Sequence, residues 1–206
     1  MDKETFLKYG CNFFNCGSQR CDGSNEWLEG CRHWKKLNEP NLEIERKWLV
    51  SGFPEEIQPK KASMIEQSYL IAGDSEVRIR HAEPIEGYPP FMSSYKMTLK
   101  GPGTLARKEI ETELTDVQFL KLMKFLDKDQ PPIIKEFYIY NMGGKRIEIS
   151  RVDGSWYYAE VEFKSDENFF IYQFPWPELV IKEVTNVEKY KMKNYWRQTR
   201  EGVVFV

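Results

Sequence analysis

Two glutamates and a lysine stand at alternate positions in a strand-like segment of the chain. Residues 41–50 read NLEIERKWLV, in which Glu43, Glu45 and Lys47 alternate with Ile44 and Arg46. Side chains at positions i, i+2 and i+4 of a β-strand share one face of the sheet. One face of this strand therefore carries two carboxylates and an ammonium group, and such groups can bind a metal ion and an anion.

The same alternation recurs in the strand-like segments that follow. Their polar face comprises Arg78, Arg80, Lys96, Thr98, Lys100, Arg107, Glu109, Glu111, Glu113, Arg146, Glu148, Ser150, Glu160 and Glu162. Their apolar face comprises Val77, Ile79, Met97, Leu99, Ile110, Ile147, Ile149, Val161 and Phe163. Half-exposed antiparallel strands alternate in this way in general. Here, however, the charges segregate into Glu-x-Glu and Arg-x-Arg pairs, whereas salt bridges on a solvated face would favour mixed strands. We therefore expect the charged face to line a barrel and the apolar face to pack against helices outside it.

Eight strand-like and two helical segments define the predicted fold. The strands are expected near residues 42–50, 65–72, 75–82, 92–100, 106–114, 133–140, 144–151 and 156–164. Residues 115–128 have apolar positions at helical spacing with Thr115 as N-cap, and a second helix is expected over 186–197. This pattern predicts a mainly β (α+β) fold, a closed eight-stranded antiparallel β-barrel with outer helices.

The chain is expected to divide near Pro40 into an extension, residues 1–40, and a barrel domain, residues 41–206. The extension holds His33 and all four cysteines, Cys11, Cys16, Cys21 and Cys31. A small zinc site or a redox element is one interpretation of this cluster. The spacing matches none of the paired CxxC patterns, so reduced thiols in a short helical extension are the favoured interpretation.

Charge and hydropathy exclude several classes of partner. The chain has 206 residues, of which 30 are basic and 32 acidic, so a net charge of −2 gives no reason to expect nonspecific binding to nucleic acid or an anionic membrane. No apolar run approaches the roughly 20 residues that span a bilayer, and the first residues lack the pattern of a secretory signal. We expect a cytoplasmic protein that binds a small molecule. Its oligomeric state stays open, a homodimer included.

A barrel interior lined by charges of both signs is costly unless the charges pair or bind a ligand. A polyanion with a divalent metal would use both signs. Arginine and lysine hold phosphate oxygens, and carboxylates hold Mg²⁺ or Mn²⁺. The pattern therefore favours a triphosphate-type substrate and phosphoryl transfer, in which positioning and electrostatics supply most of the catalysis.

The chain resembles the CYTH superfamily, also called the triphosphate tunnel metalloenzymes, over about residues 41–200. The motifs that carry the resemblance are EIERK at 43–47, QSYL at 67–70, VRIR at 77–80, TLKG at 98–101, RKEIETEL at 107–114, AEVEF at 159–163 and KEVT at 182–185, with Tyr190 and Asn194. The resemblance implies an eight-stranded tunnel that hydrolyses or cyclises a triphosphate with Mg²⁺ or Mn²⁺. It is greatest to the short members that favour inorganic triphosphate.

The resemblance also implies roles for individual residues. Glu43, Glu45 and Lys47 would be catalytic. The expected metal ligands, or residues close to the metal, are Glu43, Glu45, Glu109, Glu111, Glu148, Glu160 and Glu162. The expected substrate-binding residues are Lys47, Arg78, Arg80, Lys100, Arg107, Lys135 and Lys182, with Lys182 closing one tunnel mouth.

Two residues depart from the family pattern. The sixth strand usually carries Lys-x-Arg, but here Lys135 is followed by Glu136 and Phe137. The seventh usually ends in Glu-x-Asp, but here Ser150 stands two residues after Glu148. A carboxylate expected near the metal is therefore missing, unless Asp153 supplies it from the turn. Losing one charge-assisted contact would cost about 1.5–3 kcal/mol and slow an enzyme without abolishing its activity.

The leading hypothesis is a metal-dependent triphosphatase. Within the enzyme class, the alternatives are an adenylate cyclase or a hydrolase of thiamine triphosphate or nucleoside triphosphates. A noncatalytic sensor of polyphosphate or nucleotides is the alternative from another class, because the two departures could mark a protein that binds without turnover.

Overall fold

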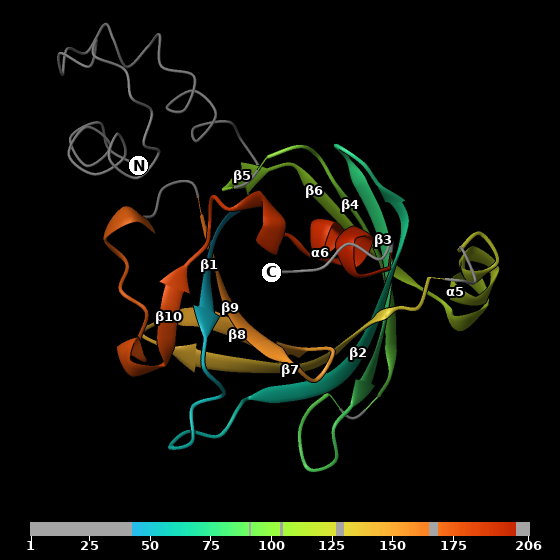
Figure 1. Ribbon diagram of the computed structural model, residues 1–206. Helices are drawn as coiled ribbons and strands as arrows, with labels where there is room; N and C mark the ends of the chain where they lie inside the picture. The colour runs from blue at the N-terminus through green and yellow to red at the C-terminus, as the bar shows by residue number, and fades with distance from the viewer. Residues whose placement is uncertain (1–42, 91, 104, 127–129, 165–168, 201–206) are drawn as a thin grey trace, which may run out of the picture.

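The computed structural model describes residues 43–90, 92–103, 105–126, 130–164 and 169–200. The predicted extension therefore lies outside the described residues. One antiparallel sheet dominates the described part (Figure 1). Its strands are β1 (Glu43–Val50), β2 (Lys61–Ala72), β3 (Glu76–Pro84), β4 (Ser94–Lys100), β5 (Ala106–Arg107), β6 (Glu109–Leu114), β7 (Ile133–Met142), β8 (Lys145–Val152), β9 (Trp156–Phe163) and β10 (Val180–Glu183).

The sheet curls into a barrel that is closed at one short contact. The strands follow the order β10-β1-β9-β8-β7-β2-β3-β4-β6, and β5 pairs with β1. Only Lys108 separates β5 from β6, so one stretch of chain joins β4 on one side to β1 on the other. The backbone N–H of Glu45 also donates to the carbonyl of Leu105 at 3.0 Å. The predicted mainly β, antiparallel barrel is confirmed, and β10 adds a short strand that the sequence pattern did not predict.

The outer face around β1, β8 and β9 is covered by an aromatic segment. Ile147, Ile149 and Val161 are fully buried there, in one cluster with Phe169, Phe174 and Trp176. This segment contains the 3₁₀ turns η2 (Phe169–Ile171) and η3 (Pro177–Leu179) rather than an α-helix. The expectation that helices cover this apolar face is therefore wrong here. Aromatic rings bury enough area to complete the core without a regular helix.

Arg46 anchors the aromatic segment to the barrel from the outward face of β1. Its guanidinium donates to Glu183 at 2.8 and 2.6 Å and to the carbonyls of Phe169 and Tyr172 at 2.7 and 2.9 Å. The side chain is buried, and these bonds compensate its desolvation. One arginine thus holds both the aromatic segment and β10 against β1.

The helix α5 (Asp116–Met123) confirms the first predicted helix. Thr115 and Gln118 form a capping box at its start, and it ends with Lys124 as C-cap, before the predicted end at 128. Its one buried residue, Phe119, packs against His81 and Tyr95 outside the barrel. No helix of the described part of the chain is long and apolar enough to cross a membrane.

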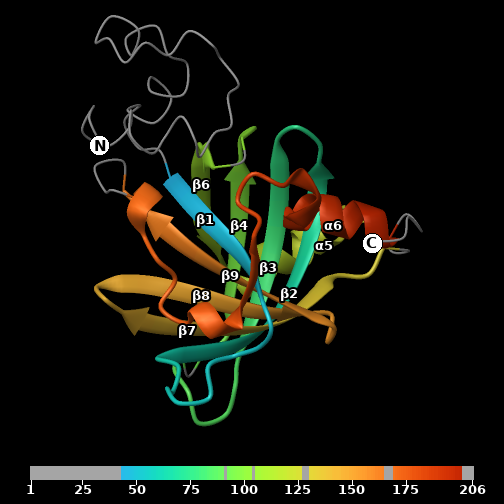
Figure 2. The same cartoon turned by 60° about the vertical axis from the view of Figure 1, so that its left-hand side comes forward.

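The helix α6 (Met192–Arg200) lies across one end of the barrel (Figure 2). It follows the 3₁₀ turn η4 (Glu188–Tyr190), so it begins later than the predicted residue 186. Tyr195 and Trp196 are buried with Tyr69 of β2, and Lys193 donates to the carbonyls of Gly73 and Asp74. This helix therefore closes the barrel end where β2 meets β3, which differs from the predicted position outside the sheet.

Candidate active site

The inward faces of the strands line a cavity of about 660 Å³ inside the barrel. Most of the predicted site residues line this cavity: Glu45, Lys47, Arg78, Arg80, Lys100, Arg107, Glu109, Glu111, Lys135, Glu148, Glu160 and Glu162. The volume is within the range of small-molecule sites. The two-residue period of the strands thus brings side chains from eight strands into one space.

Two of the predicted site residues stand apart from this set. Glu43 pairs in register with Arg107 at the start of β1, but its side chain lies outside those that the structure describes. Lys182 is exposed on β10 and does not line the cavity. Because β10 pairs with only the last residues of β1, the expectation that Lys182 closes a tunnel mouth is corrected.

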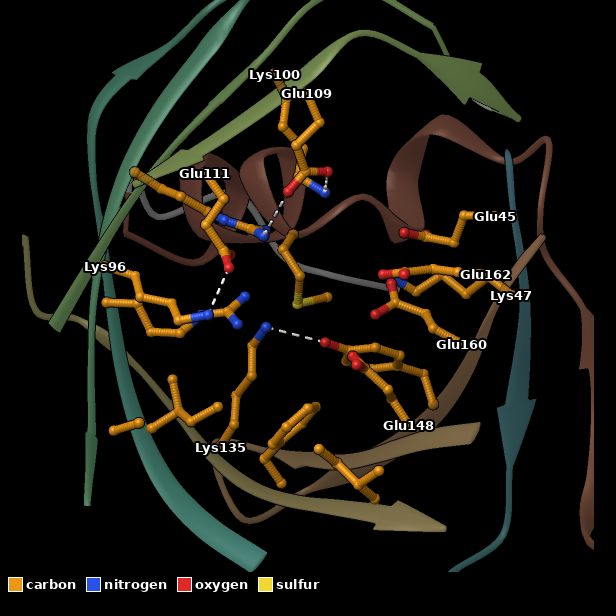
Figure 3. A pocket seen from close by; sticks show the side chains of 18 of the residues that line it. Glu45, Lys47, Lys96, Lys100, Glu109, Glu111, Lys135, Glu148, Glu160 and Glu162 are labelled. Carbon is orange, nitrogen blue, oxygen red and sulfur yellow. Dashed lines mark hydrogen bonds and ion pairs between the residues drawn. The ribbon is translucent and has the colours of Figure 1, made fainter. Parts of the chain in front are cut away.

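The carboxylates gather on the wall formed by β1, β8 and β9. Glu45 stands opposite Glu162, and Glu160 stands opposite both Lys47 and Glu148 in the registers of the neighbouring strands. Lys47 Nζ donates to Glu160 at 2.6 Å and lies 4.0 Å from the ring centroid of Tyr158. In Figure 3 these glutamates face Lys96 and Lys135 across the cavity. These carboxylates therefore gather on one side of the cavity, where Lys47 alone of the labelled lysines pairs with one of them.

Burial, neighbouring carboxylates and neighbouring lysines shift the pKa values of these glutamates. Burial, followed by the neighbouring Glu160 charge, raises the pKa of Glu45. Burial raises the pKa of Glu148 to about 7, with Glu162 and Glu160 adding to the rise and Arg146 opposing it. Burial also acts to raise the pKa of Glu160, but Lys47 and Lys135 outweigh it and hold this pKa well below its usual range. This wall therefore has more negative charge than its own cations neutralise.

Two basic groups of the cavity, Arg80 of β3 and Lys135 of β7, have only neutral hydrogen-bond partners among the described residues. Lys135 Nζ donates to Gln67 Oε1 at 3.1 Å and to Tyr158 OH at 2.9 Å, which are both neutral groups. Burial, followed by the charges of Arg80 and Arg78, lowers the pKa of Lys135 well below its usual value. Among the described residues, the buried Nε atoms of Arg78 and Arg80 have no hydrogen-bond partner. Such unsatisfied donors around one cavity favour an anionic ligand.

Beyond the predicted set, further polar residues line the cavity, among them Glu76, Lys96, Tyr158 and Lys191. Glu76 and Tyr158 lie two positions before Arg78 and Glu160, so the two-residue period could have found both. Lys96, which alternation placed on the charged face, pairs with Glu111 at 2.5 Å. Lys191 reaches the cavity from the turn before α6, and burial, then Arg107, lowers its pKa to about 8. No periodic pattern signals Lys191, because it belongs to neither a strand nor a helix.

The two departures from the family pattern stand opposite each other. Phe137 of β7 is paired in register with Ser150 of β8, and Phe137 lines the cavity. Asp153 does not replace the missing carboxylate. Its side chain accepts from the backbone of Ile134 and from Tyr195 and Arg200, and so ties α6 to the barrel. At these two paired positions the chain has an apolar side chain, Phe137, where the family pattern has a basic one, and a neutral side chain, Ser150, where it has an acidic one.

The donor set fits a divalent metal ion in its chemistry. Glu45, Glu148, Glu160 and Glu162 offer the oxygen ligands that Mg²⁺ and Mn²⁺ prefer. A cation would favour the ionised forms of Glu45 and Glu148, whose pKa values burial and then the neighbouring glutamates raise. Among the described residues, no three histidine, cysteine, aspartate or glutamate side chains already converge as a metal site. A metal would therefore have to share its coordination with the substrate or with water, as Mg²⁺ usually does.

A barrel whose interior sets carboxylates against basic groups agrees with the resemblance to the CYTH superfamily, and the fold is similar to that of a solved structure. A crystal structure of the hypothetical protein NE1496 is 29% identical, with a TM-score of 0.50, and the match covers 74% of this chain and 96% of that one. Another structure, described as the inorganic triphosphatase NE1496, is 28% identical over 74% and 93% of the two chains, with a TM-score of 0.48.

A putative adenylate cyclase from Vibrio parahaemolyticus is 15% identical with a TM-score of 0.46, and the match covers 63% of this chain and 79% of that one. No family model and no curated protein matches the chain.

Proposed function

We propose that the protein hydrolyses a phosphoanhydride bond of a triphosphate inside the barrel. One observation carries the proposal: a single cavity sets a group of carboxylates against Arg80 and Lys135, which hydrogen-bond only to neutral side chains among the described residues. The similarity to the protein described as an inorganic triphosphatase supports it. The basic groups would recognise the phosphate chain itself, so inorganic triphosphate is the smallest substrate that could use them all.

The basic residues and the carboxylates of the cavity would bind different parts of the substrate and its metal ion. Arg78, Arg80 and Lys135 would donate to phosphate oxygens and neutralise the charge that develops on them in the transition state. Lys47, held between Glu160 and the ring of Tyr158, would orient the phosphate chain beside the acidic wall. Since anion binding favours the protonated ammonium, a bound triphosphate would raise the pKa of Lys135, which burial lowers.

The acidic wall would hold the metal through Glu45, Glu148, Glu160 and Glu162. The bound Mg²⁺ or Mn²⁺ would supply charge neutralisation and an activated water at neutral pH. Water attacks the terminal phosphorus, the bond from that phosphorus to the bridging oxygen breaks, and the bridging oxygen leaves on the remaining diphosphate. The products are orthophosphate and diphosphate, or the diphosphate ester when the substrate is an organic triphosphate.

Phosphate release from inorganic triphosphate, ATP and thiamine triphosphate, each with Mg²⁺ and with Mn²⁺, tests the proposal. We expect metal-dependent release of orthophosphate. Cyclic nucleotide and diphosphate from ATP would instead identify a cyclase. Tight binding of triphosphate without turnover would identify a sensor, and the hydrolase proposal would be wrong in both cases.

A further inference from the structure

Large apolar side chains are exposed on one outer side of the barrel. Among the described residues, twelve such side chains are more than a third exposed, and seven of these gather in two adjoining sets, a row across the sheet and the helix α5. Around β1, β8 and β9 the outward apolar side chains are instead buried under the aromatic segment. The two sets therefore mark a part of the outer face that the described residues leave uncovered.

The first set is a row of side chains that crosses four neighbouring strands. Ile71 of β2 is paired in register with Val77 of β3. Val77 is paired with Leu99 of β4, and Leu99 with Ile110 of β6. The sequence neighbours of Val77, Leu99 and Ile110 line the cavity, so these three side chains point out of the barrel. The row is continuous because register partners lie side by side, and only Val77 within it is half-buried.

The second set belongs to α5, which stands outside the barrel beside β3 (Figure 1). Val117, Leu120 and Met123 are spaced by three residues, so they share one side of the helix, and all three are exposed. Phe125, which follows the helix directly, is also exposed. The helix thus presents a ridge of large apolar groups to the surroundings of the barrel.

The row and the ridge adjoin at the end of β2. Phe125 lines a groove together with Leu70 and Ala72, which are the sequence neighbours of Ile71. The four residues of the row and the four of the ridge are here called the outer apolar patch. One end of each set therefore contributes to a single surface.

The area of the outer apolar patch is comparable with what a stable dimer buries. Large side chains cover roughly 150–250 Å² each, so seven of them at about half exposure offer on the order of 700 Å². A standard protein interface removes about 800 Å² from each partner. Monomers rarely expose contiguous apolar patches beyond about 300–600 Å². The patch is therefore larger than a monomer normally leaves in contact with water.

The charges that border the patch favour a second copy of the chain over a membrane. The exposed charged residues next to it in sequence are of both signs: Asp74, Lys108, Asp116, Lys121 and Lys124. An anionic membrane surface would call for a clear surplus of basic residues. A nearly balanced border can instead meet its own copy without strong repulsion, and it resembles the polar rim of a protein interface.

We propose that the outer apolar patch is the interface of a homodimer, in which the same patch of two copies meets about a two-fold axis. Because α5 stands out beside the row, the ridge of each copy packs against the row of the other. The interface lies outside the barrel, so this inference does not depend on the proposed hydrolase function.

Sedimentation equilibrium of the full chain tests the proposal first. Interfaces of this size have dissociation constants of about 1 μM or lower, so dimer should predominate in samples between about 10 and 100 μM. Hydrogen exchange measured at low and high protein concentration gives a second readout, in which the amides of α5 should exchange more slowly in the dimer. Monomer alone at 100 μM would overturn the proposal.

Two exposed isoleucines on strands supply a matched pair of variants. Ile110→Lys places an ammonium group in the interface and should raise the dissociation constant of the dimer at least about tenfold. Ile181→Lys on β10 is the control, because Ile181 is 67% exposed, Ile110 is 63% exposed, and Ile181 lies outside the patch. Leu120→Lys should act like Ile110→Lys from the ridge. Thermal melting verifies that each variant is folded, and the wild-type measurements stand even if one is not.

The remaining outcomes separate this interface from other occupants of the patch. A dimer that Ile110→Lys and Ile181→Lys weaken equally, or whose α5 amides gain no protection, uses another surface, and the assignment is then wrong. A monomer that floats with vesicles of phosphatidylcholine and phosphatidylserine would show that the patch binds a membrane instead. Loss of phosphate release would not bear on the proposal, whereas loss of the dimer would leave the hydrolase function standing.

Discussion

Lys135 is a buried cation whose removal should stabilise the protein and weaken its function. The side chain is 3% exposed and its Nζ donates only to the neutral oxygens of Gln67 and Tyr158. Burial and the nearby Arg80 and Arg78 charges lower its pKa well below the usual 10.5. A lysine with a lowered native pKa costs folding free energy at neutral pH, because the unfolded chain binds its proton more tightly.

The magnitude for Lys135→Met follows from the contacts. Replacing buried ionic groups by apolar ones of similar volume is often neutral or stabilises proteins by about 1–4 kcal/mol. The two acceptors of Lys135 keep other partners, since Arg80 donates to Gln67 and Ser150 hydrogen-bonds to Tyr158. Losing the two hydrogen bonds from Lys135 therefore costs roughly 1 kcal/mol or less. We expect a net gain of about 1–3 kcal/mol, or roughly 2–10 °C in melting temperature.

The sign of the effect can be tested by pH. The penalty for the buried lysine is full below its native pKa and disappears as the pH rises towards 10.5, where both states are neutral. The stability difference between Lys135→Met and the wild type should therefore shrink with rising pH. Chemical denaturation at a series of pH values measures it.

The same substitution should reduce the affinity for inorganic triphosphate, measured by calorimetry without divalent metal. Losing one charge-assisted contact costs about 1.5–3 kcal/mol, or about 10- to 150-fold. The control is Lys96→Met, because Lys96 is paired with Glu111 and is 34% exposed, so its stability should change by less than about 1 kcal/mol. A lower melting temperature for Lys135→Met, or unchanged affinity, would refute the reasoning.

Three further expectations concern the acidic wall, the metal and the attachment of α6. Glu160→Gln should lower the rate of hydrolysis at least about 100-fold with unchanged circular dichroism, because Lys47 loses its charged partner. The control is Glu178→Gln at an exposed position, which should hydrolyse the substrate at the wild-type rate. Equal rates in the two variants would contradict this expectation. A chelator should abolish hydrolysis and added Mg²⁺ or Mn²⁺ should restore it, so undiminished release of phosphate in excess chelator would exclude the metal. Asp153→Asn should cost about 1–2 kcal/mol in urea denaturation, because the Asp153 carboxylate accepts from Tyr195 and Arg200 at 2.8 and 2.9 Å at a half-exposed position. Burial acts to raise the pKa of Asp153, but the hydrogen bond from Arg200 outweighs it and lowers this pKa below 3.8. The difference in unfolding free energy between wild type and Asp153→Asn should therefore be present above pH 3.8 and vanish as the pH falls through the lowered native pKa. A constant difference down to strongly acid pH would contradict the role given to the Asp153 carboxylate.

Alternation explains why the strands and most of the cavity could be predicted from sequence. In a two-residue period, identifying one inward residue such as Glu45 or Arg80 assigns its whole strand, and an antiparallel register keeps charged faces together. Glu76 and Tyr158 follow the same two-residue period, but each stands one step outside the Arg-x-Arg or Glu-x-Glu motif on which the prediction rests. The strand pattern therefore contains more of the site than the charged motifs alone.

The remaining features depend on packing between distant parts of the chain. Lys191 enters the cavity because η4 and α6 cross the barrel end, and no local pattern specifies that crossing. The aromatic segment covers the outer face through contacts such as Arg46 with Tyr172, which are 126 residues apart. The sequence predicts Lys182 at a tunnel mouth, whereas the structure exposes it on the short strand β10, whose pairing with β1 sets its orientation. Tertiary context decides such short or irregular segments.

The strand order has a consequence for how the chain is built. β1 precedes the other strands in sequence, yet its long partner is β9, and Lys47 meets Glu160 across 113 residues of intervening chain. Its other contacts are the two residues of β5 and the late strand β10. During synthesis β1 therefore emerges long before its main partner β9, whereas β2, β3, β4 and β6 can pair with one another as soon as they have been made. Closing so large a loop is slow, and we expect the last step of folding to be the capture of the first strand by the last ones.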